Sequence, residues 1–240
     1  MHAPGSSCSQ KTRIFLNLKG IPWESHVVDL RSAANYEPWY LGINPRGLVP
    51  CLVHDGAVHI ESNDIIEYLE EAFPEPALIP VDRRGRVHEL LRMEDELHRY
   101  LRILTFRYVI PTRPGAMKSE DALERLRNHD GTISGQVDSR KQDEIRFWEA
   151  ANREGIADGQ VSESIIRFRS AVGDLNSALN DSEFILGCEL SVVDIAWYVY
   201  ASRLIAAGYP VHRWHVHVGA WYDRLDARPE FRAEVSLPPA

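Results

Sequence analysis

Residues 4–20 read PGSSCSQKTRIFLNLKG, and this stretch defines the first element of the fold. A Pro-Gly pair is typical of a turn, and Gly20 is a residue at which a helix commonly ends. Apolar residues stand among polar ones between these two points, so we expect a helix over residues 9–19. Three consecutive residues that carry a hydroxyl or a thiol come directly before it: Ser6, Ser7 and Cys8.

The start of a helix favours an anion, because its first N–H groups have no acceptor within the helix and carry a partial positive charge. A thiolate is such an anion, and the hydroxyls of Ser6 and Ser7 could donate hydrogen bonds to it. Lowering a thiol pKa from about 8.5 to about 6.5 requires roughly 2.7 kcal/mol. One charge-assisted hydrogen bond and a helix end can supply that much. The alternative interpretation is that these serines only cap the helix.

The first 76 residues alternate between short elements of different types. SHVVDL at 25–30 is a short apolar run that predicts a strand. LVPCLVHDGAVHI at 48–60 predicts a hairpin, because an Asp-Gly turn signal separates two apolar runs. SNDIIEYLEEAF at 62–73 places its apolar residues on one helical face. We therefore expect a small α/β unit.

Three prolines between residues 74 and 80 predict a linker between two domains. Beyond the linker the chain is helical almost throughout, with helices expected at 86–108, 119–129, 137–155, 162–181, 191–208 and 218–231. The fold class is therefore α+β. We expect an α/β domain at 1–76 and an all-α domain at 84–240.

Composition excludes several classes of function. The formal net charge is −8 and no basic block occurs, which argues against nucleic acid or an anionic membrane as a partner. No apolar run approaches the roughly 18 residues of a membrane span, and the N-terminus lacks the basic and apolar regions of a signal peptide. Three widely spaced cysteines indicate a reduced, cytoplasmic setting. Cys51 and Cys188 lie in apolar runs and are expected to be small core residues.

Four local patterns occur in order along the chain: PGSSCSQKTRI at 4–14, NPRGLVPCL at 44–52, Glu61-Ser62, and LSVVDIAWYVY at 190–200. Together they resemble the glutathione transferase superfamily, over essentially the whole chain. The SSCS tetrad is similar to the zeta (maleylacetoacetate isomerase) class, and SCSQKTR is similar to bacterial tetrachlorohydroquinone dehalogenases. The charged stretch at 118–160 resembles that of bacterial glutathione-dependent β-aryl-etherases.

The resemblance implies a thioredoxin-like N-terminal domain of βαβ-ββα order and an all-helical C-terminal domain that forms the acceptor pocket. It also implies glutathione as co-substrate and a homodimer, leaving open whether a heterodimer forms instead. In the thioredoxin-like order a central strand precedes the Pro4-Gly5 turn, but only Met1, His2 and Ala3 stand there. We therefore expect a truncated first strand or a rearranged sheet.

The resemblance assigns the sulfur of glutathione to Ser6, with Ser7 and Cys8 as the next candidates for a catalytic role. In dehalogenase-like relatives the cysteine that matches Cys8 exchanges with a glutathionyl adduct, whereas in most zeta-like relatives it only lines the site. Both roles stay open.

The remaining glutathione contacts follow from the same resemblance. It implies a cis bond before Pro50, which would expose the backbone of Val49 to the cysteinyl part of glutathione. Glu61 and Ser62 would hold the γ-glutamyl ammonium and carboxylate at a helix start. Ser62 is equally well placed to cap that helix.

The acceptor pocket is expected where the helix at 86–108 faces the first domain, with Tyr100, Arg107 and Tyr108 as candidate wall residues. The alternative is that these three are surface or core positions of a long helix. Ser191 and Asp194 form a structural capping box. The histidines of VHRWHVH lack further ligands at metal-site spacing, so no metal is expected.

We therefore expect an enzyme that activates the glutathione thiolate and delivers it to a small, hydrophobic, aromatic electrophile. Conjugation, or ether or halide displacement, would place it in detoxification or aromatic compound degradation. One alternative is a glutathione-dependent cis–trans isomerase, although Leu48 stands where zeta-like relatives have glutamine. Another is a non-catalytic binding or scaffold protein that keeps the fold.

Overall fold

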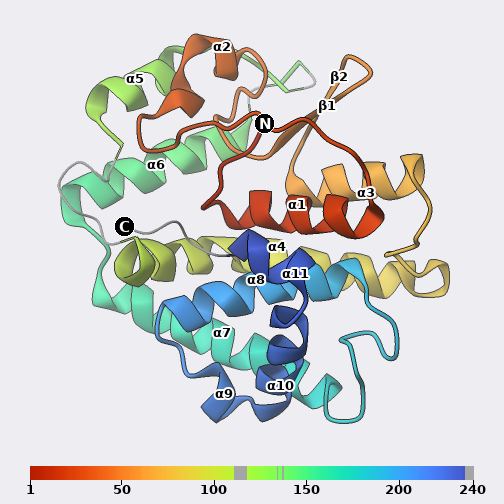
Figure 1. Cartoon of the computed structure of the whole chain (residues 1–240). Helices are drawn as coiled ribbons and strands as arrows, with labels where there is room; N and C mark the ends of the chain where they lie inside the picture. The colour runs from red at the N-terminus through yellow and green to blue at the C-terminus, as the bar shows by residue number, and fades with distance from the viewer. Residues whose placement is uncertain (111–117, 134, 137, 236–240) are drawn as a thin grey trace.

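The structure is a computed structural model that describes residues 1–110, 118–133, 135–136 and 138–235. Its N-terminal elements are α1 (Ser7–Lys19), a 3₁₀ turn (Ala34–Tyr36), α2 (Pro38–Leu41), β1 (Cys51–His54), β2 (Ala57–Ile60) and α3 (Ser62–Ala72). A second 3₁₀ turn (Val81–Arg83) and then helices follow: α4 (Arg84–Leu104), a π-helical turn (Thr105–Val109), α5 (Glu120–Asn128), α6 (Ser139–Glu154), α7 (Asp158–Ala178), α8 (Val192–Ala206), α9 (Val211–Trp214), α10 (Val216–Asp226) and α11 (Pro229–Val235). The α+β class is confirmed (Figure 1).

The predicted hairpin is present as β1 and β2, paired antiparallel with Cys51 opposite Ile60. Its turn residues Asp55 and Gly56 both have positive φ, 49° and 80°, as a two-residue hairpin turn of this twist requires. The hairpin projects at the upper right of Figure 1, beside α3.

The prediction of a strand over residues 25–30 is wrong. Only an isolated parallel bridge between Val27 and His2 forms there. The His2 N–H donates to His26 O at 2.9 Å, and the Val28 N–H donates to His2 O at 2.8 Å. Met1 pairs on the other side, where its carbonyl accepts from the Cys51 N–H at 3.0 Å. Met1 and His2 therefore lie between the segment at 25–28 and β1, and backbone hydrogen bonds join them to both.

The main core lies where α4, α7 and α8 pack on one another and α1 packs on α8. Because α8 is buried on nearly every face, its start is also buried, and Asp194 is fully enclosed. Its carboxylate accepts from the Ser191 N–H and hydroxyl, the Ile185 N–H and the Trp221 indole N–H at 2.9–3.0 Å. These bonds satisfy donors that burial would otherwise leave unpaired.

A smaller apolar cluster joins α5 and α6 to the segment around α2. Leu123 and Leu126 of α5 and Trp148 of α6 are buried with Tyr36 and Leu41. Figure 1 shows the two helices beside α2 at the upper left, although they belong to the predicted all-helical part. The charged segment at 118–155 is thus packed against the N-terminal elements.

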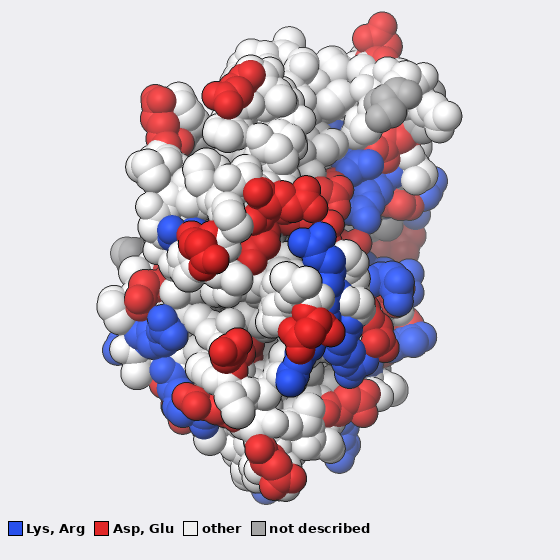
Figure 2. All heavy atoms as spheres, turned by 90° about the vertical axis from the view of Figure 1, so that its right-hand side faces the viewer, with Lys and Arg blue, Asp and Glu red and all other residues white. Residues whose placement is uncertain are grey.

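The surface of the molecule carries charges of both signs. Figure 2 shows acidic and basic side chains interspersed on one face, without a broad basic area. No helix in the described ranges is long and apolar enough to cross a membrane.

Cys51 is buried, as predicted, but Cys188 is exposed, which corrects its predicted place in the core. Cys188 lies in the connection between α7 and α8, directly after the isolated β-bridge between Phe184 and Gly187.

Candidate functional site

The start of α1 carries the first group of candidate residues. Ser6 has an extended backbone (φ −79°, ψ 124°), and its Oγ accepts from the Ser9 N–H at 3.3 Å, so it caps the helix. Its hydroxyl hydrogen is not used by that bond and stays available to donate. The first turn contains no acidic residue, and the N–H groups of Ser7 and Cys8 have no acceptor within the helix. From α8, Arg203 donates to Gly5 O at 2.8 Å and so holds the turn before the helix.

The segment 44–50 presents a second set of backbone groups. The Val49–Pro50 bond is cis, as the resemblance implied. The neighbouring Leu48 carbonyl accepts from the Tyr40 hydroxyl at 2.6 Å and from Asn44 Nδ2 at 2.8 Å. Within the described chain the N–H and C=O of Val49 have no hydrogen-bond partner. They are therefore open to pairing with an extended peptide.

The start of α3 forms the third part of the site. Glu61 precedes the helix with φ 67°, an unusual value for a residue with a side chain. Its carboxylate accepts from Arg46 on one oxygen and from Arg140 of α6 on the other. Ser62, the first residue of the helix, is buried. Glu61 is thus already ion-paired to two guanidinium groups, which no local sequence pattern indicates.

Two contacts between elements bring these three parts together. Lys11, one turn into α1, donates to Asn63 Oδ1 in the first turn of α3 at 2.7 Å. The same ammonium is paired with the buried carboxylate of Glu94 on α4 at 2.9 Å. The second contact is the bond from Arg46, beside the cis-proline segment, to Glu61. The starts of α1 and α3 and the Val49 backbone therefore lie around one site.

A pair of titratable side chains joins this site to α4. Cys8 Sγ lies 3.9 Å from His98 Nδ1, and the Tyr200 hydroxyl of α8 lies 3.0 Å from the same nitrogen. Burial opposes ionisation of both groups, but their mutual attraction outweighs it. The pKa of Cys8 is lowered by the His98 imidazolium, and the pKa of His98 is raised by the Cys8 thiolate. The role of His98 could not be predicted from the sequence, since a contact across 90 residues leaves no local pattern.

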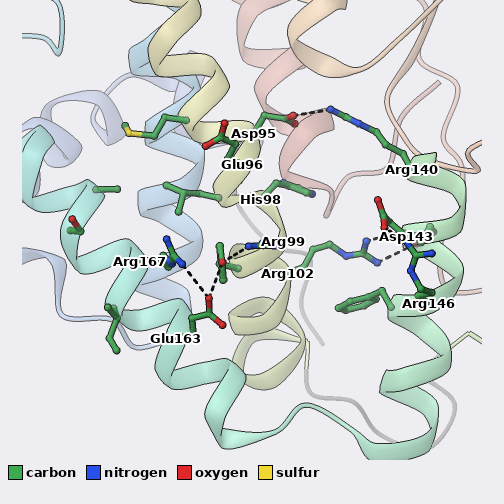
Figure 3. Close-up of a pocket in the computed structure, with 18 of the residues that line it drawn as sticks. Asp95, Glu96, His98, Arg99, Arg102, Arg140, Asp143, Arg146, Glu163 and Arg167 are labelled. Atoms are coloured by element: carbon green, nitrogen blue, oxygen red, sulfur yellow. Dashed lines mark hydrogen bonds and ion pairs between the residues drawn. The ribbon is translucent and has the colours of Figure 1, made fainter. Parts of the chain in front are cut away.

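A cavity of about 1300 Å³ opens beside His98, between α4, α6 and α7 (Figure 3). Apolar side chains on its wall include Leu48, Leu97, Tyr100, Phe147 and Ile166. Charged side chains on the same wall form pairs that Figure 3 shows as dashed lines: Asp95 with Arg140, Arg102 with Glu144, and Glu163 with Arg167.

Of the three predicted wall residues, the structure brings only Tyr100 to this cavity. Arg107 instead donates to Ile156 O at 3.0 Å and pairs with Asp158, since the chain leaves the regular helix at Thr105. Tyr108, in the same π-helical turn, is half exposed and is not among the described residues that line the cavity. The long α4 predicted to extend through these two residues ends before them.

The histidines near the C-terminus have ordinary partners. His212 pairs with Asp223, and His215 lies 2.9 Å from the Tyr209 hydroxyl. Over the described ranges no group of three or more histidine, cysteine or carboxylate side chains is arranged to hold a metal ion.

Comparison with known families identifies the class of protein. Residues 5–72, which contain the starts of α1 and α3 and the cis-proline segment, match the family model of the glutathione S-transferase N-terminal domain. Residues 5–72 therefore form a glutathione S-transferase N-terminal domain, and the chain as a whole is similar to the glutathione S-transferase superfamily. Its N-terminal part has the thioredoxin-like fold of that superfamily, and its C-terminal part is helical.

Individual relatives differ in how much of the chain they resemble. Protein LigF of Sphingobium sp. (strain NBRC 103272 / SYK-6) is 29% identical over 238 residues, covering 95% of this chain and 89% of LigF. The crystal structure of the β-etherase LigF superposes with a TM-score of 0.80 at 26% identity, over 97% of this chain and 96% of that one. Maleylpyruvate isomerase of Ralstonia sp. is 44% identical over 81 residues, 34% of this chain and 38% of that protein. The likeness to LigF thus spans the chain, whereas the likeness to the isomerase covers about a third of it.

Proposed function

We propose that this protein is a glutathione transferase that activates the thiol of glutathione at the start of α1 and transfers the sulfur to an aromatic electrophile. The observation that carries the proposal is the convergence of two helix starts and the unpaired backbone of Val49 beside a large cavity. An anionic sulfur suits the first of these, and a peptide backbone suits the last. The N-terminal region at 1–76 would hold glutathione, and the region at 84–240 would hold the acceptor.

In this proposal the thiolate, the cysteinyl backbone and the γ-glutamyl group of glutathione each have a partner. The Ser6 hydroxyl donates to the thiolate while its lone pair keeps the cap to Ser9, and Ser7 and Cys8 contribute N–H groups. The backbone of Val49 pairs with the cysteinyl residue. Ser62 and the first N–H groups of α3 receive the γ-glutamyl carboxylate, and Glu61 receives the ammonium.

The acceptor class follows from the mixed character of the cavity wall. Leu48, Leu97 and Phe147 favour an aromatic body, and the neighbouring charged pairs favour polar groups on it. We therefore propose an oxygenated aromatic acceptor, broader than the purely hydrophobic one expected from the sequence. Ether displacement is our first choice of reaction, because LigF, described as a β-etherase, is similar over the whole chain. Catalysis by a homodimer in the cytoplasm also belongs to the proposal.

Substitution at Ser6 tests the proposal. With glutathione and 1-chloro-2,4-dinitrobenzene, Ser6→Ala should lower kcat/KM about 10- to 100-fold, the value of one charge-assisted hydrogen bond. The pH midpoint of kcat/KM should also move upward. Ser6→Thr keeps both the hydroxyl and the cap and should retain most of the activity. Because loss of the cap alone costs about 1 kcal/mol, thermal unfolding of both variants is measured alongside. Unchanged activity in Ser6→Ala would contradict the assignment.

A cis–trans isomerase is the second candidate, supported by the identity of the first third of the chain to maleylpyruvate isomerase. An isomerase regenerates glutathione, whereas a transferase consumes it. Counting free thiol before and after turnover therefore separates the two. Retention on glutathione resin without turnover of any electrophile would favour a binding protein.

A further inference from the structure

We propose that His98 is the acid that protonates the leaving oxygen of the acceptor, so that this site favours displacement of aryloxide groups over displacement of halide. The inference rests on the proposed function. It goes beyond it by naming a residue for the departing group and a chemical class of leaving group.

The position of His98 is the first support. Its side chain is the one histidine among the described residues that line the large cavity. The ring also reaches Cys8, two residues after Ser6 in the first turn of α1. His98 therefore stands between the proposed place of the thiolate and the proposed place of the acceptor (Figure 3).

The hydrogen bonds of the ring occupy Nδ1 and leave Nε2 free. The Tyr200 hydroxyl donates to Glu94 O at 3.1 Å, so its oxygen is free to accept from His98 Nδ1 at 3.0 Å. Nδ1 therefore carries a hydrogen in either charge state. Nε2 has no hydrogen-bond partner within the described chain. The protonated ring can thus donate from Nε2, and the neutral ring keeps a lone pair there.

The charge around His98 favours the protonated ring. Burial disfavours it, but the Cys8 thiolate and the Glu94 carboxylate outweigh burial and the Arg102 guanidinium, so the pKa of His98 is raised. The titratable and charged groups around the ring and the adjoining cavity come from five elements: Cys8 and Lys11 of α1; Glu94, Asp95, Glu96, Arg99 and Arg102 of α4; Arg140, Asp143, Glu144 and Arg146 of α6; Glu163, Arg167 and Asp174 of α7; and Tyr200 of α8.

The step is balanced without any further reactant. The glutathione thiolate attacks the carbon that bears the aryloxy group, and the C–S bond forms as the C–O bond breaks. The electron pair of the broken bond goes to oxygen, which takes the proton from His98 Nε2 and leaves as a phenol. The proton lost when the next glutathione ionises restores the imidazolium.

Three acceptors test the proposal. Chloride leaves 1-chloro-2,4-dinitrobenzene without a proton, 2-(4-nitrophenoxy)-1-phenylethanone releases a weakly basic aryloxide, and 2-phenoxy-1-phenylethanone releases a strongly basic one. In His98→Gln, kcat should fall about 100-fold with the phenoxy ether, less with the nitrophenoxy ether, and at most about 3-fold with the chloride. His88→Gln is the matched control, because His88 is a half-exposed residue of the same helix paired with Glu67.

The wild-type enzyme provides a second readout that does not depend on folding of the variant. The kcat for the phenoxy ether should fall as the pH rises through the pKa of His98, and the kcat for the chloride should not. Equal losses with all three acceptors in His98→Gln, or the same alkaline limb for ether and chloride, would overturn the role of His98. Absence of wild-type transfer to every acceptor would instead overturn the proposed function, and this inference with it.

Discussion

Cys8 differs from the other two cysteines in the charged groups that surround it. Its sulfur lies at a helix start, 3.9 Å from His98 Nδ1, with Lys11 one turn further along the helix. Burial raises its pKa, but His98 and Lys11 lower it further than burial raises it, so the net pKa lies below that of an ordinary thiol. By contrast, burial raises the pKa of Cys51 to about 11. The two thiols should therefore differ in reactivity near neutral pH.

We expect Cys8 to stay reactive toward iodoacetamide at a lower pH than a free thiol, whose pKa is about 8.5. Because its folded pKa is lowered, the thiolate persists as the pH falls until the pH passes that lowered value. The measurement is the alkylation rate against pH in a Cys188→Ser background, which removes the exposed thiol, with the site assigned by peptide mass. His98→Gln should shift this profile to higher pH. An identical profile in the two proteins would show that His98 does not hold the thiolate.

At the scale of elements, the turn at 44–47 determines how the cis-proline segment is presented. Gly47 has φ 64°, and a Cβ built there would lie 2.6 Å from the ring of Tyr36. Its carbonyl accepts from Asn35 Nδ2 at 2.6 Å, so the turn cannot shift to relieve the clash. The backbone of Val49 follows two residues later and inherits this geometry.

Gly47→Ala should therefore destabilise the protein by about 2 kcal/mol or more, because left-handed backbone strain and a steric clash occur together. The KM for glutathione should rise in the fraction that remains folded. Urea unfolding and steady-state kinetics measure the two effects. Gly173→Ala, inside α7 with 4.0 Å of clearance, is the matched control and should stabilise by about 1 kcal/mol. If Gly47→Ala left the free energy of unfolding unchanged, the turn would not be rigid.

Part of the fold could be predicted from the sequence, element by element. Local signals were sufficient for the Asp-Gly hairpin, for α1 ending at Gly20 and for the buried start of α8, since each depends on residues a few positions apart. The segment 25–30 has the composition of a strand but pairs through one bridge, because pairing depends on the partner. His98 and Arg140 reach the site from other helices, and contacts of that kind carry no local periodicity.

For the whole molecule, Glu144 connects the N-terminal elements with the cavity wall. It is buried on α6, where its carboxylate accepts from the Tyr36 hydroxyl at 3.0 Å, from the Trp148 indole, and from both terminal nitrogens of Arg102. Arg102 in turn lies 3.9 Å from the centroid of the Phe147 ring. One carboxylate thus connects the segment before α2 with α4 and α6. Its removal should therefore weaken the contacts of both parts.

Glu144→Gln should lower the free energy of unfolding by about 3 kcal/mol near pH 7, because the guanidinium of Arg102 loses its counter-charge in a buried setting. Burial opposes the charge of Glu144, but Arg102 and the hydrogen-bond donors outweigh it and lower its pKa. A carboxyl with a lowered folded pKa stabilises above its unfolded value, about 4.3, and loses that stabilisation as the pH falls through the folded value. The difference in the free energy of unfolding between variant and wild type, measured with urea, should therefore stay constant from pH 7 to pH 5. It should become smaller only below pH 5.

Glu149→Gln provides the comparison for this last experiment. Glu149 lies on the same helix but is exposed, and it pairs with Arg127 at the surface. Exposed pairs contribute about 1 kcal/mol or less, so this variant should unfold almost as the wild type does. If Glu144→Gln behaved like Glu149→Gln, the N-terminal elements would be held to α6 by the apolar cluster around Tyr36 alone. The acceptor cavity and the glutathione site would then be joined by packing, with no contribution from the buried charge.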